Sequence, residues 1–130
     1  MAKRLLNQKM QIDHFVSSPA KRAKGTAKLF VDEFKGNSNE IVLIPNLYEA
    51  DVQTFYDVVS GFDDDFGTVA LFSHNPGITN FANSLTEVRV DGIPTCGIYA
   101  VAADVEKWSA FAEAKKTFLF FDYPKSDSKE

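Results

Sequence analysis

The sequence DHFVSSPAKRAKGTAKLFVDEF, residues 13–34, places a short apolar segment directly before an amphipathic one. Asp13 to Ser17 is predicted as a strand, with Ser18 as the N-cap of a helix and Pro19 as its first residue. Gly36 to Asn39 is expected to end that helix. The apolar residues recur at helical spacing and predict a buried stripe of Ala20, Ala23, Ala27, Phe30, Val31 and Phe34.

The alternation of strand and helix continues along the chain. Further strands are predicted at Ile41–Ile44 (a buried type, stopped by Pro45), Thr68–Phe72, Gly97–Ala102 and Thr117–Phe121. Asp51 is the candidate N-cap of a helix that faces the core with Phe55, Val58 and Val59. A helix after Gly77 points Ile78, Phe81, Ala82 and Leu85 inward, and a short one covers Val105–Ala114. This order of elements indicates an α/β sheet.

Length and composition limit the classes of protein. The chain has 130 residues, 45% hydrophobic and 25% charged, which suits one folded domain, and a formal net charge of −4, which argues against a basic nucleic-acid binder. Apolar runs such as Phe118–Phe121 are far too short to cross a bilayer. We expect no signal peptide and no membrane partner, a polar tail at 125–130, and a reducing, cytoplasmic location for a chain whose single cysteine is Cys96.

Two strand ends carry side chains suited to chemistry, because ligands in open α/β sheets bind beyond the carboxyl ends of strands. Ser17 and Ser18 lead into a helix N-terminus, which attracts anions, and Arg22 lies in its first turns. The planar guanidinium of Arg22 can bind a phosphoryl group with two hydrogen bonds. The alternative is an ordinary exposed arginine on a lysine-rich helix, and this segment alone favours that alternative.

The second strand end is Ser73-His74-Asn75-Pro76-Gly77. A histidine between an apolar strand and a Pro-Gly turn is not in a typical core position, so we expect His74 to face the crevice, where it can carry charge near neutral pH. A capping or packing role is the less favoured alternative.

Other chemistries find little support in the sequence. His14 and His74 are the two histidines, so we expect no zinc site, and we expect no metal or cofactor of another kind. The acidic run Asp63–Asp65 is expected to be a solvated loop. Structural roles are expected for His14, for Cys96 as a small buried residue, and for Trp108 as a packing residue.

Together, five blocks in order resemble the small bacterial SixA-type phosphohistidine phosphatases of the histidine phosphatase superfamily. The blocks are Ser17–Ala23 with Thr26-Ala27, Leu47–Ala50, Ser73–Gly77 with Thr79, Ala82-Asn83 and Leu85-Thr86, Ile93–Gly97, and Asp104 with Trp108. The resemblance covers about Lys3 to Pro124. It implies a three-layer α/β/α fold with a mostly parallel central sheet, which we expect over residues 1–124.

The resemblance also implies phosphoryl transfer through a phosphohistidine intermediate. Arg22 matches a phosphate-clamping arginine, and His74 matches the second active-site histidine. Ser18 and Asn75, which lie in the same two blocks, are expected to bind the substrate as well. Glu49 lies near the place where some relatives keep a proton donor. The implied substrate is a phosphorylated protein histidine or a small phosphoester.

One departure from the family matters for both fold and activity. The family opens with a central strand that ends in Arg-His-Gly or Arg-His-Ala and supplies the nucleophile, whereas Met1–Met10 resembles the end of the helix after it. His14 begins a strand, and the residue directly before it is Asp13 rather than an arginine, so it cannot replace the nucleophile.

We therefore expect an N-terminally incomplete domain with little or no turnover. The possible explanations are a fragment or mis-started product, a sheet that closes differently, or a partner chain in the gap, such as a second copy in a homodimer joined at the exposed sheet edge. A non-catalytic phosphate- or phosphoprotein-binding module and a ligand-free interaction protein are the alternative functions.

Overall fold

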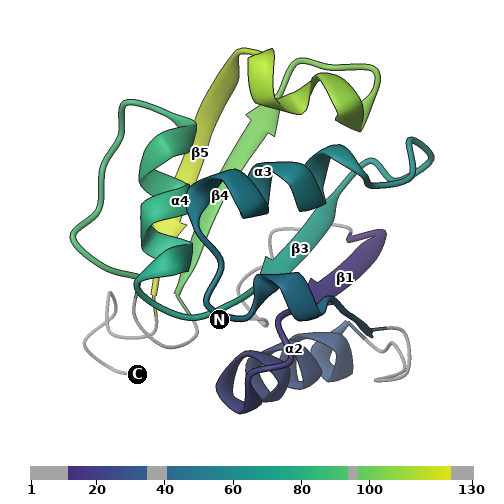
Figure 1. Ribbon diagram of the computed structural model, residues 1–130, viewed down its shortest axis with the longest axis vertical. Helices are drawn as coiled ribbons and strands as arrows, with labels where there is room; N and C mark the ends of the chain where they lie inside the picture. Colours follow the sequence, from purple (N-terminus) through teal and green to yellow (C-terminus); the bar gives the residue numbers. More distant parts are fainter. Residues whose placement is uncertain (1–11, 35–40, 94–96, 124–130) are drawn as a thin grey trace.

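The computed structural model describes residues 12–34, 41–93 and 97–123, and its centre is a parallel sheet (Figure 1). The sheet contains β1 (His14–Ser17), β2 (Ile41–Leu43) and β3 (Val69–Phe72) in the order β2-β1-β3. The last residue of β1, Ser17, lies opposite Leu43 and Phe72, so the three strands end at one edge. The α/β class predicted from the alternation is confirmed.

A second sheet joins β4 (Ile98–Ala103) and β5 (Lys116–Asp122) as antiparallel neighbours, with a register shift between Ala100 and Val101. Within the described residues no ladder connects β3 to β4. The predicted central sheet is therefore divided into two sheets, and β3 is paired on one side only.

Helices cover both faces of the parallel sheet, which gives the expected three layers. Helix α2 (Lys21–Glu33) packs on one face, where Phe30 and Val31 contact Phe15. Helices α3 (Val52–Ser60) and α4 (Gly77–Leu85) lie on the other face. The buried residues on that face are Leu47, Phe55, Val59, Phe81 and Phe111.

The start of α2 differs from the prediction, whereas its buried stripe is confirmed at Ala23, Ala27, Phe30 and Val31. The helix begins at Lys21, and Ala20 rather than Ser18 is the N-cap residue. The reason is local, because the Ser18 hydroxyl accepts from the Ala20 amide at 3.1 Å and the Ser18 amide donates to the Phe72 carbonyl at 2.9 Å. These bonds keep residues 18–20 in a turn beside β3.

Two further predictions are corrected. The strand at Ile41–Leu43 is not buried, since Val42 and Leu43 are each 44% exposed, because β2 has β1 as its one partner in the described sheet. The predicted helix at Val105–Ala114 is a shorter 3-10 helix, η3 (Trp108–Glu113), because the Trp108 backbone amide is already bonded to Asp64.

The remaining elements follow the predictions closely. Asp51 caps α3, accepting from the Thr54 amide at 2.9 Å, and Phe55 and Val59 are buried below it. No helix among residues 12–34, 41–93 and 97–123 is long and apolar enough to cross a membrane. The predictions for Met1–Met10, Gly36–Asn39, Cys96 and the tail at 125–130 fall outside the described residues.

Candidate functional site

The segments that follow the three parallel strands start side by side. The Ser18 amide donates to the Phe72 carbonyl, and the Ile44 amide donates to the Ser17 carbonyl, each at 2.9 Å. These bonds extend the sheet by one residue and align the turn into α2, the 3-10 helix η2 (Pro45–Leu47) and the loop at His74. Segments from distant parts of the sequence thus begin side by side at the carboxyl edge of the sheet.

Arg22 stands in the first turn of α2, and its side chain is exposed. The first bond of this helix runs from the Lys24 amide to the Ala20 carbonyl at 3.0 Å. The amides of Lys21, Arg22 and Ala23 precede that bond and have no partner in the preceding turn of helix. With no acidic residue in the first turn, this helix end carries positive charge from both the helix dipole and Arg22.

His74 follows β3 and is partly buried. Its Nδ1 is shielded from solvent, and no described residue offers it a hydrogen bond. The Tyr48 ring lies beside it, with ring centroids 5.7 Å apart and an angle of 58° between the planes. A shielded ring nitrogen without a partner costs about 1–3 kcal/mol.

Tyr48 was not among the residues predicted for the site. Its side chain is 55% exposed and follows η2 at the end of β2, in the Leu47–Ala50 block that carried part of the resemblance. Its contact with His74 depends on pairing between strands, which the local sequence does not reveal. Its phenol adds a second polar aromatic group to this edge.

Glu49 is exposed and has a positive φ of 54°, in the loop between η2 and α3. That loop touches the start of α4, since a methyl group placed on Gly77 would lie 2.7 Å from the Ala50 carbonyl oxygen. The backbone at Glu49 therefore lies close to the loop that carries His74.

Ser18 and Asn75 have structural uses in the described molecule. The Ser18 side chain is fully buried and its oxygen serves the turn before α2. Asn75 is exposed, but its amide donates to the Ile93 carbonyl at 2.9 Å and its oxygen accepts from Thr79. Asn75 thus fastens the loop before β4 to the first turn of α4.

His14 lies at the opposite end of β1. Its ring stacks on Phe66, with centroids 4.3 Å apart, and burial lowers the pKa of its imidazole. The first residue of a parallel strand is remote from the carboxyl edge, so His14 is far along β1 from the turn before α2.

The acidic loop also has a structural use. Asp63 accepts from the Asp65 amide at 2.9 Å, and Asp64 accepts from the Trp108 amide at 2.8 Å. Within the described ranges, no three His, Cys, Asp or Glu residues come together as a metal ligand set.

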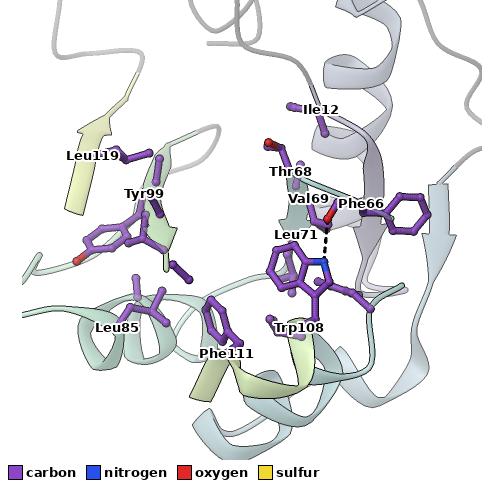
Figure 2. Close-up of a pocket in the computed structure, with 18 of the residues that line it drawn as sticks. Ile12, Phe66, Thr68, Val69, Leu71, Leu85, Tyr99, Trp108, Phe111 and Leu119 are labelled. Atoms are coloured by element: carbon purple, nitrogen blue, oxygen red, sulfur yellow. Dashed lines mark hydrogen bonds between the residues drawn. The ribbon is translucent and has the colours of Figure 1, made fainter. Parts of the chain in front are cut away.

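A cavity of about 800 Å³ lies between β3 and β4 (Figure 2). Its lining residues do not include Arg22, Tyr48 or His74. The cavity is therefore a feature separate from the polar groups at the carboxyl edge.

Comparison with known proteins identifies the fold. No protein-family model matches the sequence, and no curated protein matches it significantly. Three solved structures are similar to it: phosphohistidine phosphatase SixA from Agrobacterium tumefaciens (20% identity, TM-score 0.72), SixA from Nakamurella multipartitia (15%, 0.74), and the protein histidine phosphatase SixA complexed with tungstate (22%, 0.79). Each match covers 95–96% of this chain and 75–78% of the chain in the solved structure. The chain has the SixA-type fold.

Proposed function

We propose that this chain, which has the fold of SixA phosphohistidine phosphatases, is a phosphatase-like domain that binds a phosphoryl group at the carboxyl edge of its parallel sheet. The observation that carries the proposal is the unpartnered, shielded Nδ1 of His74 at the edge where α2 begins. The substrate class is a phosphorylated protein histidine or a small phosphoester.

Arg22 supplies a fixed positive charge and a planar pair of donors for two phosphoryl oxygens. The first amides of α2 add backbone donors from the same helix end. His74, when protonated, donates to a third oxygen, and the Tyr48 ring holds the imidazole from one side. Such a set stabilises the charge that builds up on the phosphoryl oxygens during transfer.

Hydrolysis through a phosphohistidine intermediate needs a nitrogen nucleophile in line with the leaving group. His14 and His74 are the histidines of this sequence, and His14 is stacked on Phe66 at the other end of β1. With His74 assigned to the phosphoryl oxygens and His14 at the other end of β1, neither histidine is placed for the attack. We therefore propose phosphoryl recognition with little or no turnover by this chain alone.

Glu49 is proposed as the proton donor to an oxygen leaving group, because its loop contacts the start of α4 near His74. Ser18 and Asn75 contribute by shaping the edge: Ser18 holds the turn into α2, and Asn75 holds the loop before β4.

Titration calorimetry with orthophosphate and with tungstate tests the proposal. Arg22→Ala is expected to weaken binding about tenfold or more, whereas Lys28→Ala, which removes an exposed charge from the same helix, has little effect. If the two variants lose the same affinity, the anions are attracted by the basic helix in general rather than bound by Arg22. Rapid hydrolysis of a phosphohistidine peptide or para-nitrophenyl phosphate would overturn the argument about the nucleophile.

A further inference from the structure

The loop before β4 returns along α4 and is held there by side chains of that helix. Residues 86–93 of the loop are described, and Figure 1 shows them running back from the end of α4 toward its beginning. Asn83 donates to the Val90 carbonyl at 2.9 Å and accepts from the Val90 amide at 2.8 Å. One helical turn earlier, Thr79 accepts from the Ile93 amide at 3.0 Å. The loop is thus attached to successive turns of α4.

Thr79 joins the end of this loop to the residue that follows His74. Its hydroxyl accepts from the Ile93 amide and donates to the side-chain oxygen of Asn75. The Asn75 amide closes a ring of three bonds by donating to the Ile93 carbonyl at 2.9 Å. One hydroxyl group therefore serves a backbone donor and a side-chain acceptor, and Thr79 is buried, with 7% of its surface exposed. Removing that hydroxyl would leave both groups without this partner.

The backbone at His74 is held by the beginning of the same helix. The His74 carbonyl accepts from the Ile78 amide at 3.1 Å, and the next residue, Asn75, is bonded to Thr79. The imidazole has less support of its own, because no described residue bonds its shielded Nδ1 and the ring beside it belongs to the exposed Tyr48. The direction of the imidazole therefore depends on the backbone of residues 74 and 75.

We infer that Thr79 is a positioning residue for His74. It acts through Asn75, whose side chain it fixes, and so it sets the backbone from which the imidazole projects. Asn83 holds the same loop at Val90, three residues before Ile93, and has no bond to residue 75 among the described contacts, so it supports the loop without orienting His74. The consequence for phosphoryl binding rests on the proposed function, whereas the effect on His74 itself needs no ligand.

Proton NMR of the two imidazole rings tests the positioning in the absence of any anion. His14→Phe leaves His74 as the remaining histidine and so assigns its signal. Thr79→Val keeps the branched shape of the side chain but removes the hydroxyl group, and it should shift or broaden the His74 signal. Thr79→Ser keeps the hydroxyl and should leave the signal as it is in the natural chain. Asn83→Ala, which also removes bonds to the loop, should leave it unchanged.

Titration calorimetry with tungstate tests the consequence for binding. Thr79→Val should weaken binding about three- to tenfold, as the displacement of one hydrogen-bonding group predicts, whereas Thr79→Ser and Asn83→Ala should stay within about twofold of the natural chain. Urea denaturation of the same variants separates this effect from stability, because Thr79→Val and Asn83→Ala should both lower the midpoint of unfolding.

Two results would overturn the inference. The first is a His74 signal that Thr79→Val leaves unchanged. The second is an equal loss of tungstate affinity in Thr79→Val and Asn83→Ala, because the loop would then act through general stability and Thr79 would have no particular role.

The measurements also distinguish this inference from the proposed function. If the natural chain binds no tungstate but Thr79→Val still moves the His74 signal, the phosphoryl site is wrong and the positioning of His74 stands. If tungstate binding is lost with Arg22→Ala and kept in full with Thr79→Val, the phosphoryl site stands and Thr79 has a structural role alone.

Discussion

The indole N–H of Trp108 donates to the carbonyl of Phe66 at 2.9 Å, and this bond joins η3, between β4 and β5, to the loop before β3 (Figure 2). Trp108 also packs edge-on against Phe62, with ring centroids 5.5 Å apart. Trp108 thus links the connection between β4 and β5 to the segment that leads into β3. We expect it to hold β4 at its distance from β3.

Replacing Trp108 with Phe keeps an aromatic ring but removes the donor to Phe66. We expect a loss of about 1–3 kcal/mol in the free energy of unfolding, because a part-buried carbonyl loses its partner. Urea denaturation followed by circular dichroism measures this, since the variant no longer has the chain's single tryptophan as a fluorophore.

Trp108→Ala provides the comparison, because it removes the ring as well and should cost more than Trp108→Phe. If Trp108→Phe unfolds at the same urea concentration as the natural chain, the hydrogen bond to Phe66 contributes nothing to the junction of the sheets.

Gly77 and Gly25 form a matched pair for the same substitution. At Gly77 an added methyl group would lie 2.7 Å from the Ala50 carbonyl oxygen and 3.3 Å from Cε2 of Phe55, whereas at Gly25 nothing lies within 4 Å. Gly77→Ala should therefore lower the free energy of unfolding by about 1–3 kcal/mol. Gly25→Ala, inside α2, should raise it by about 0.5–1 kcal/mol.

Thermal unfolding of the two variants checks the signs. If Gly77→Ala leaves the free energy of unfolding unchanged, the loop at Ala50 can move away from the added methyl group without loss of stability. The close approach of that loop to the His74 segment would then not be required for folding.

The sequence patterns predicted the helices and strands, but they did not predict the exposure of β2 or the length of η3. The Asp51 cap and the buried side of α2 depend on neighbours within a few residues, so local spacing was sufficient to predict them. The exposure of β2 and the shortening of η3 depend on partners far along the chain. Asp64 fixes Trp108 across 44 positions, and no local pattern contains that bond.

The candidate site likewise has a part that local sequence predicts and a part that depends on distant contacts. The strand-end rule predicts that Arg22 and His74 lie at one edge of the sheet. In the structure β1, which precedes Arg22, pairs in parallel with β3, which precedes His74. The contact of Tyr48 with His74 was missed, because it joins the segments after β2 and β3, which are not neighbours in the sheet. An exposed sheet edge was expected from the resemblance, whereas the apolar residues that line the space beside β3 depend on the packing of both helical layers.

His14 should make the stability of the fold depend on pH. Burial lowers the pKa of its imidazole from the ordinary value of 6.5, so the unfolded chain takes up a proton at a higher pH than the folded chain does. The stability contributed by the neutral ring is complete above pH 6.5 and is lost as the pH falls through that value toward the folded pKa. His14→Phe keeps a ring against Phe66 but does not titrate. Between about pH 7.5 and about pH 5 the natural chain should lose more of its free energy of unfolding than the variant does, as measured by urea denaturation at each pH. Equal losses would show that His14 takes up its proton as readily in the folded chain as in the unfolded one.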